Sequence, residues 1–370
     1  MFFQTSLRRA VLPTPTRRLP ISLSRKWLTT EQKQIVKSTI PALEQHGLNA
    51  LAHAVWAYAV NIDHPEALAG AVSRIGHKHA SLGVTADQYP IVGKHLLAAI
   101  KEVLGPAVTA PVVDAWGAAY QELADIFITF ESNIYQQSVE TPGGWKGWRK
   151  FFISDKVSES DEIISFHLTP PRQYSLSDSP SPDHFRISVK QEFASGPKPA
   201  GRISNVLHES LPVGAELDVS MPFGDFVLDV NATSPAVLIS GGVGLTPMMS
   251  MLKTIIQQQG QARQVVFIHA ARNGHVHAMK QDLARITADH PSVSRIVFYE
   301  ETTKRDKQGV DYDHVGRFDL VKVREEAVIP DANYYICGPQ PFMKAQSMSL
   351  EAMGVSPDRI HMEVFGSPSD

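Results

Sequence analysis

The stretch Ala236-Val-Leu-Ile-Ser-Gly241-Gly-Val-Gly244-Leu-Thr-Pro247 decides the fold expected for this chain of 370 residues. Its first five residues are apolar or small and predict a buried parallel strand, after which the glycines turn the chain. Thr246 is a natural N-cap, and Pro247 suits the first position of a helix. A glycine turn that leads into a helix offers backbone N–H groups to a phosphate. The turn differs from the G-x-G-x-x-G fingerprint, because Pro247 stands at the position of the third glycine. A purely structural strand–helix turn is therefore the alternative interpretation.

The residues after this turn alternate between strand and helix patterns. Strands are expected at 265–268, 295–299, 334–337 and 360–364, and helices at 247–259, 276–286 and 342–353. This alternation predicts an α/β, doubly wound parallel sheet, which binds ligands at the carboxyl ends of its strands. Residues suited to ligand binding fall at those ends: Gly242, Gly244, His269 to Asn273, Cys337-Gly338-Pro339 and Glu363 to Phe365.

Composition excludes several classes of protein. The apolar fraction of 43% and the charged fraction of 20% are ordinary for a globular chain. A net charge of −3 gives no reason to expect nucleic acid as a partner. The single cysteine, Cys337, excludes an internal disulfide, and no apolar run reaches the roughly 18 residues of a membrane span. We expect a monomer of two to three domains.

Residues 1–26 differ from the rest of the chain. They contain six basic residues and several hydroxyl residues but no acid, since the first acidic residue is Glu31. This composition predicts a mitochondrial transit peptide, and hence a location in the mitochondrial matrix. A disordered basic tail on a cytoplasmic protein is the alternative, because Pro13, Pro15 and Pro20 interrupt a long amphipathic helix.

Three further segments follow. Residues 27–140 show only helical periodicity, beginning with a capping box at Thr29 and Gln32. Residues 145–232 contain short strands separated by turns rich in proline and serine, which predicts a small antiparallel barrel. Residues 233–370 form the α/β domain. We expect strands in the barrel at 150–154, 163–168, 185–190 and 217–219.

Several motifs occur together in a recognisable order. Arg172-Gln-Tyr174-Ser175, Gly201-Arg-Ile203-Ser204, the glycine turn and Cys337-Gly338-Pro339 resemble the ferredoxin–NADP reductase superfamily. With Lys78-His79-Ala-Ser81 in the helical segment and Glu363-Val-Phe365-Gly366 at the end, the chain resembles a flavohaemoglobin from about Thr29 to Gly366. That family joins an all-α globin to an FAD barrel and an NAD(P)H domain. The resemblance implies haem b, FAD and NAD(P)H as cofactors and the oxidation of nitric oxide with O₂.

The resemblance assigns three residues to haem. His79 matches the proximal iron ligand, and imidazole is a common axial ligand of globin iron. Tyr89 and Glu131 match the catalytic residues that hydrogen-bond to the proximal imidazole, which makes it a stronger electron donor. Without this context a helical histidine is more often a core or solvated residue. His77 and His95 lie on the same stretch but outside the motif.

The resemblance also assigns residues to FAD. Arg172 matches the partner of the pyrophosphate, Tyr174 lies against the isoalloxazine, and Ser175 lies near its reactive edge. Gly201, Ile203 and Ser204 belong to a loop that offers N–H groups to the phosphates. Phe365 matches an aromatic residue that covers the flavin. An ordinary surface arginine at Arg172 and a strand-core phenylalanine at Phe365 are the alternatives.

The remaining assignments concern the nicotinamide coenzyme. Gly242, Gly244, Thr246 and Pro247 form the phosphate turn, while Cys337 and Gly338 suit contact with nicotinamide. A plain buried cysteine has the same appearance. Arg272 lies just past a strand end, where it suits a 2′-phosphate and would favour NADPH. The alternative, an ordinary exposed arginine on the surface, fits the sequence equally well.

The chain departs from the family pattern at two junctions. Between Gly47 and Leu51 about 30 residues of short helices are expected but missing, and with them the distal tyrosine, since the first tyrosine is Tyr58. At Pro170-Pro171 about 25 residues, or two barrel strands, are missing. Skipped exons or an incorrect gene assembly would produce such losses. The alternative functions are therefore a haem-poor NAD(P)H flavin oxidoreductase and an inactive truncated product.

Overall fold

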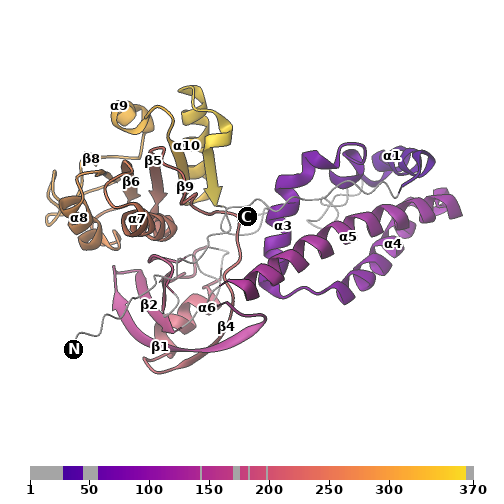
Figure 1. Cartoon of the computed structure of the whole chain (residues 1–370), viewed down its shortest axis with the longest axis horizontal. Coiled ribbons are helices and arrows are strands. Elements are labelled where there is room, and N and C mark those ends of the chain that lie inside the picture. Colours follow the sequence, from indigo (N-terminus) through magenta and orange to yellow (C-terminus); the bar gives the residue numbers. More distant parts are fainter. Residues whose placement is uncertain are drawn as a thin grey trace, which may run out of the picture. The chain divides into compact units, whose positions relative to one another are not determined.

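The computed structural model describes residues 28–44, 57–141, 144–169, 176–181, 184–196 and 199–363 (Figure 1). The chain divides into a helical unit, which ends at Gly147 and takes in Phe223–Asp225, and a unit with two sheets, formed by Trp148–Pro222 and Phe226–Gly366. Several predictions lie outside the described residues. These are the targeting segment 1–26, the two junctions, and the residues Arg172, Tyr174, Ser175 and Phe365.

The helical unit is built around one long helix. Its main helices are α1 (Thr30–Glu44), α3 (Ala69–Leu82), α4 (Tyr89–Leu104) and α5 (Ala110–Glu140). Figure 1 shows α5 running alongside α3 and α4, and the core includes Trp116, Phe127 and Phe130 on α5. The capping box predicted at the start is confirmed, because Thr29 N donates to Gln32 Oε1 at 2.9 Å and Gln32 N donates to Thr29 Oγ1 at 3.1 Å.

The second unit begins with an antiparallel sheet. Its strands are β1 (Trp148–Ser158), β2 (Ile163–Thr169), β3 (Phe185–Lys190) and β4 (Glu216–Ser220), in the order β3-β2-β1-β4. Within the described residues β3 and β4 are not paired with each other, so this sheet is open. The sheet is therefore half of the expected barrel, as the prediction of missing strands requires.

The same unit contains a parallel sheet. Its order is β10 (Ile360–Glu363), β9 (Asn333–Cys337), β5 (Ala236–Gly241), β6 (Val265–Ala271), β7 (Val293–Tyr299) and β8 (His314–Val315). All of its pairings are parallel, which confirms the predicted fold class. The strand order reverses beside β5, because β6 follows on one side whereas β9 lies on the other. Such a switch point opens a crevice at the carboxyl ends of the two strands.

Helices cover both faces of this sheet. One core contains residues of α7 (Leu245–Gln259) and α8 (Lys280–Asp289), and the other contains residues of α9 (Arg324–Ala327) and α10 (Gln340–Ala352). The helix expected over 276–286 begins only at Lys280, since Met279 before it has a left-handed backbone. The short β8 and α9 were not predicted, because two- and four-residue elements carry no periodic signal.

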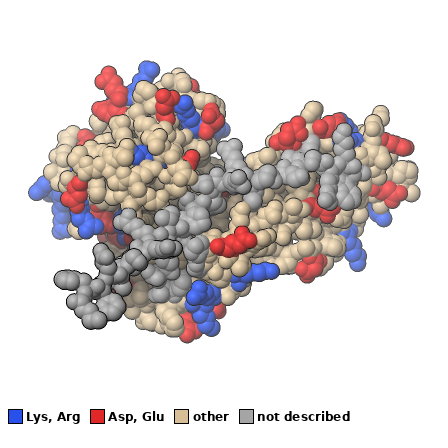
Figure 2. Space-filling model, in the orientation of Figure 1, with Lys and Arg blue, Asp and Glu red and all other residues tan. Residues whose placement is uncertain are grey.

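The distribution of charge on the surface and the character of the described helices agree with the near-neutral net charge and the lack of a long apolar run in the sequence. On the face shown in Figure 2, positive and negative side chains are interspersed. None of the described helices combines the length and apolar character needed to cross a membrane.

Candidate cofactor sites

His79 in the helical unit belongs to a hydrogen-bonded group of three side chains. Its Nδ1 lies 2.8 Å from Glu131 Oε1 and 3.1 Å from the Tyr89 hydroxyl oxygen. The Tyr89 hydroxyl donates to the same Glu131 oxygen at 2.6 Å. Because a carboxylate only accepts, the proton on the imidazole lies at Nδ1. The other ring nitrogen, Nε2, therefore carries a lone pair, and among the described residues it has no hydrogen-bond partner.

Three helices supply this group, and two glycines let them approach. A Cβ atom on Gly76 of α3 would lie 2.3 Å from the Phe130 ring of α5. A Cβ atom on Gly93 of α4 would lie 2.5 Å from the Tyr120 ring. The Tyr120 hydroxyl donates to the backbone oxygen of Tyr89 at 2.7 Å, which fixes the start of α4. These close contacts bring His79, Tyr89 and Glu131 together from positions 10 and 52 residues apart.

The three side chains of this group differ in their exposure to solvent. Glu131 is 2% exposed and Tyr89 8% exposed, whereas the His79 side chain is 32% exposed. Burial, followed by the hydrogen bond to Glu131, raises the pKa of Tyr89 well above its ordinary value. Tyr89 therefore remains a neutral donor. A buried acceptor behind a partly exposed, unpartnered Nε2 fits an axial ligand of haem iron.

The two other histidines of this stretch differ from His79. His77 meets the Phe130 ring edge-on at 5.7 Å, and its buried Nδ1 has no partner among the described residues. Burial lowers the pKa of the half-buried His77, which favours its neutral form. His95 is exposed on α4. Neither shares the Glu131 carboxylate. No cluster of three or more metal-binding side chains occurs among the described residues, so an iron ligand here would act as a single imidazole.

The glycine turn lies at the switch point of the parallel sheet. Gly242 has φ +55° and open space at its Cβ position, whereas Gly244 has φ −59°. A Cβ atom on Gly244 would lie 2.2 Å from the Cys337 carbonyl oxygen, and one on Gly338 would lie 3.2 Å from Gly241 N. The loops after β5 and β9 are thus in backbone contact. This places the predicted residues Gly242, Gly244, Cys337 and Gly338 together.

The prediction that Thr246 is the N-cap of α7 is wrong. Gly244 is the N-cap residue, so Thr246 and Pro247 lie inside the first turn, where both are buried. The helix begins two residues earlier than expected, because the glycine turn continues directly into it as a short 3₁₀ turn, Gly242–Gly244. The free N–H groups at this helix N-terminus therefore belong to the backbone of the turn, without a threonine side chain as a cap.

Cys337 is fully buried, with 0% exposure. Burial, followed by the charge of Glu363, raises the pKa of its thiol well above the ordinary value. The thiol therefore stays protonated and does not act as a nucleophile. Its position at the end of β9 nevertheless places its backbone and that of Gly338 at the crevice, where a nicotinamide ring is expected.

A polar chain runs across the same edge of the sheet, and of its members the sequence pointed only to His269, among the residues expected at the strand ends. The Ser240 hydroxyl donates to Ile268 O at 3.2 Å and lies 2.9 Å from His269 Nδ1. The rings of His269 and His277 are 4.6 Å apart, and His277 Nδ1 lies 2.9 Å from the Tyr299 hydroxyl. Burial lowers the pKa of His269 to about 4 and lowers that of His277 as well. His269 follows the predicted strand directly, which was the available signal.

The loop at Gly201–Ser204 opens the short helix α6 (Arg202–Asn205). Ser204 Oγ accepts from Glu192 N and donates to Gly201 O, both at 3.2 Å. A Cβ atom on Gly201 would lie 2.8 Å from the Glu192 Cβ, so glycine is required for this close approach. The serine hydroxyl therefore shapes the loop, while Ile203 is 44% exposed beside it.

Arg272 at the end of β6 is not free. Its guanidinium contacts the Glu162 carboxylate, and its side chain is 56% exposed. A nearby hollow of about 160 Å³ lies between the loops after β6 and β7. His275, Lys280, Thr303, Arg305 and Asp306 line it. Arg272, the residue expected to meet a 2′-phosphate, is paired with the Glu162 carboxylate, and Lys280 in the hollow is paired with Asp311.

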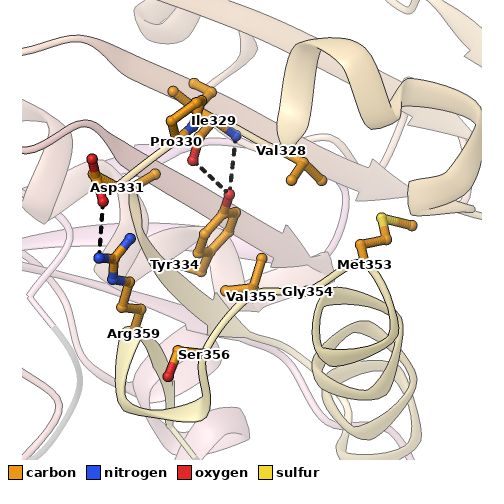
Figure 3. Close-up of a pocket in the computed structure, with 11 residues that line it drawn as sticks. Val328, Ile329, Pro330, Asp331, Tyr334, Met353, Gly354, Val355, Ser356 and Arg359 are labelled. Atoms are coloured by element: carbon orange, nitrogen blue, oxygen red, sulfur yellow. Dashed lines mark hydrogen bonds and ion pairs between the residues drawn. The ribbon is translucent and has the colours of Figure 1, made fainter.

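A larger pocket of about 370 Å³ lies elsewhere (Figure 3). In its wall Arg359 contacts Asp331 at 2.9 Å, and the Tyr334 hydroxyl accepts from Ile329 N at 3.1 Å. The lining residues precede or begin β9 and precede β10. The pocket is therefore at the amino ends of these strands, on the opposite edge of the sheet from the glycine turn.

Two family matches agree with the division of the chain into a helical unit and a unit with two sheets. Residues 33–127 match the family described as Globin. Residues 238–348 match the family described as Oxidoreductase NAD-binding domain. The first match contains His79 and Tyr89, and the second contains the glycine turn and Cys337.

Curated relatives extend over most of the chain. A flavohemoprotein of Rhizobium meliloti is 44% identical over 399 positions, which cover 92% of this chain and 98% of the relative. A flavohemoprotein of Bordetella pertussis is also 44% identical, over 401 positions covering 92% of this chain and 99% of the relative. Because these alignments are longer than the 370 residues of this chain, they include positions at which it has no residue. That is the result expected for internal deletions.

Solved structures show the same fold. A flavohemoglobin from Malassezia yamatoensis with bound FAD and heme has a TM-score of 0.72 and 24% identity, and it covers 92% of this chain and 100% of its own. The flavohem-like FAD/NAD binding domain of nitric oxide dioxygenase from Vibrio cholerae has a TM-score of 0.52 and 32% identity. It covers 59% of this chain and 99% of its own.

Proposed function

Because this chain belongs to the flavohemoprotein family, we propose that it oxidises nitric oxide to nitrate with O₂ and electrons from NAD(P)H. Family membership supports an oxidoreductase in which electrons pass from NAD(P)H through FAD to haem. When bound, FAD accepts hydride from the coenzyme, and haem b takes single electrons and binds O₂. The identity of the substrate as nitric oxide goes beyond what family membership supports and is our proposal.

The arrangement of His79, Tyr89 and Glu131 carries this proposal. His79 would hold the iron through Nε2, while Glu131 draws on the proton at Nδ1 over 2.8 Å. A buried carboxylate in this position increases the electron donation of the imidazole to iron, which favours activation of O₂ over simple storage. Tyr89 fixes the carboxylate through its 2.6 Å hydrogen bond, so the ring orientation of His79 is set by two partners.

The glycine turn and the loop after β9 would hold the coenzyme. The helix N-terminus at Gly244 suits the pyrophosphate, and the adjacent Cys337–Gly338 backbone suits the nicotinamide. For FAD, Gly201, Ile203 and Ser204 form the described part of the site. Arg172, Tyr174, Ser175 and Phe365 complete it in our proposal, on the resemblance of their motifs to the family.

One observation favours a second candidate, a reductase that acts without haem. The parallel sheet and its helices are complete, whereas only residues 45–56 separate α1 from the helical residues 57–60. Such a short connection leaves little chain for the wall of a haem pocket that faces His79. The nucleotide half would then pass electrons from NAD(P)H to a soluble acceptor.

An absorption spectrum of the purified chain separates the candidates. A Soret band together with flavin bands, and NAD(P)H-dependent consumption of nitric oxide, support the proposed function. Flavin bands alone support the reductase. A chain with neither band is an inactive product, and the proposal is then wrong. Import of the full chain into isolated mitochondria tests the further proposal that residues 1–26 direct it to the matrix.

A further inference from the structure

Four charged side chains in the unit with two sheets form a closed ring. Arg186 Nε lies 3.6 Å from Asp178 Oδ2, and Lys253 Nζ lies 3.4 Å from the same oxygen. Lys253 Nζ also lies 3.1 Å from Asp282 Oδ2, which in turn lies 3.6 Å from Arg186 Nη1. Cation and anion thus alternate around the ring, and its net charge is zero.

The ring joins two parts of the unit. Arg186 lies on β3 of the antiparallel sheet and Asp178 lies in the segment that leads to β3, while Lys253 on α7 and Asp282 on α8 belong to the parallel-sheet layer. Each part therefore supplies one cation and one anion, and each cation contacts the anion of the other part. The Arg186 side chain is 6% exposed, and those of Lys253, Asp178 and Asp282 are 18%, 23% and 29% exposed. The ring is a largely buried joint.

Neutral contacts reinforce this joint. The Ser250 hydroxyl of α7 donates to the Asp178 backbone oxygen at 2.8 Å. Arg186 Nε donates to Ser177 Oγ at 3.2 Å, and its Nη2 lies 3.9 Å from Met279 Sδ. Met279 has φ +53°, a conformation that is rare for a bulky residue. The fold therefore holds a strained residue in place directly against the guanidinium.

We propose that Arg186, Asp178, Lys253 and Asp282 are positioning residues that hold the flavin part of the unit in register with the nicotinamide part. The inference rests on the proposed function. Helix α7 begins at the glycine turn, and Lys253 lies within the same helix, so movement at the ring moves the coenzyme site. On the other side, Asp178 follows closely after Arg172, Tyr174 and Ser175 in the sequence. Hydride transfer requires the two rings in contact, and a shift of about 1 Å costs about 100-fold in rate.

The placement of the four charges suits the ring to fixing the orientation of the two parts more than to raising the stability of the fold. Buried ion pairs are often no more stabilising than apolar residues of the same volume, because both charges lose their hydration. What alternating charges do provide is a unique register, since sliding one part against the other brings like charges together. The ring is therefore suited to fixing an orientation.

The experiment compares Lys253→Met with Arg285→Met in the full chain loaded with FAD. Arg285 lies 3.1 Å from Asp282 but is 68% exposed and contacts neither Asp178 nor Arg186 in the described structure, so it is the matched control. Anaerobic stopped-flow measurement gives the rate of flavin reduction at saturating NADH, the Kd of NADH and the charge-transfer absorbance. FAD content is measured in parallel.

We expect Lys253→Met to lower the rate of flavin reduction at least tenfold and to weaken the charge-transfer band, with FAD content and Kd within twofold of the parent. Lys253→Arg should restore most of the rate, and Arg285→Met should leave it unchanged. Unchanged reduction by Lys253→Met, or a loss equal to that of Arg285→Met, would overturn the proposal.

A second measurement keeps this result separate from the proposed function. If the parent chain binds no FAD, the proposed function fails, but the ring is still testable through thermal unfolding of Asp178→Asn, Lys253→Met and the double variant. Decreases in Tm that do not add support a direct link between the two parts. Additive decreases show that the ring does not couple them, and the inference is then wrong.

Discussion

Gly244 and Cys337 are in such close contact that a Cβ atom on Gly244 would lie 2.2 Å from the Cys337 carbonyl oxygen. Neither backbone can move freely, since Gly244 caps α7 and Cys337 ends β9. The glycine is therefore required by the packing of two loops rather than by the space that a phosphate occupies. Its φ of −59° is accessible to any residue.

We predict that Gly244→Ala lowers the free energy of unfolding by about 1–3 kcal/mol, because the methyl group overpacks the contact with Cys337. Nucleotide binding should be lost with it as the two loops separate. Gly242→Ala is the control, since Gly242 has φ +55° and open space, and it should cost about 1–2 kcal/mol through strain alone. Urea unfolding and NADH titration check both variants. Full nucleotide affinity in Gly244→Ala would contradict this account.

His79→Ala should abolish the Soret band of the haem-loaded chain, because no other described histidine shares a buried carboxylate. His77→Ala is the matched control on the same helix and should retain the band. Glu131→Gln should keep haem but raise the iron reduction potential, since a neutral amide draws less on the Nδ1 proton. Spectra and potentiometric titration test the three variants. A histidine-ligated spectrum in His79→Ala would move the ligand elsewhere.

Stability should fall as the pH falls from about 6.5 to about 4. Burial lowers the pKa of His269 from 6.5 to about 4, so in this window the unfolded chain binds a proton that the folded chain does not. The stability is complete above pH 6.5, and up to about 3 kcal/mol is lost through this one group. His269→Asn should make the profile measured by urea unfolding less steep, although His277 still contributes, whereas substitution of the exposed His64 should leave it unchanged. A parent profile that is flat over this range would refute the assignment.

Glu162→Gln should shift coenzyme preference toward NADPH. The Glu162 carboxylate neutralises Arg272, and its removal leaves the guanidinium available to a 2′-phosphate. Because the pair is partly exposed, we expect only a two- to fivefold rise in the ratio of kcat/KM for NADPH to that for NADH, or about 1 kcal/mol at most. Arg272→Gln in the same background should remove the gain. An unchanged ratio would show that Arg272 lies outside the coenzyme site.

Restoring the two junctions should accelerate nitric oxide consumption. A chain with about 30 residues inserted at Gly47–Leu51 and about 25 at Pro170–Pro171, lengths based on ordinary helices and strands, would regain a distal wall and two strands. Turnover with NAD(P)H, measured at equal haem and FAD loading, should be at least tenfold faster than for the 370-residue chain. Equal rates would mean that the missing segments are dispensable.

The sequence by itself was enough to predict most strands and helices and the residue types suited to binding haem and nucleotide. Alternating apolar runs and helical periodicity identified the parallel sheet, since those patterns depend on residues two to four positions apart. The local motifs around His79 and Gly242 predicted an iron ligand and a nucleotide turn, whereas Tyr89 and Glu131 were assigned from the resemblance to the family. The prediction of two lost segments also came from sequence, through the spacing of motifs that flank the junctions.

The tertiary structure decided which distant residues meet. The Gly244 turn at the start of α7 lies against the end of β9, more than 80 residues later in the chain. The Ser240–His269–His277 chain and the ring that contains Arg186 and Asp282 join residues from different strands and helices. No local pattern predicts such contacts, because the free energy that selects them comes from burial and charge pairing between segments that only folding brings together.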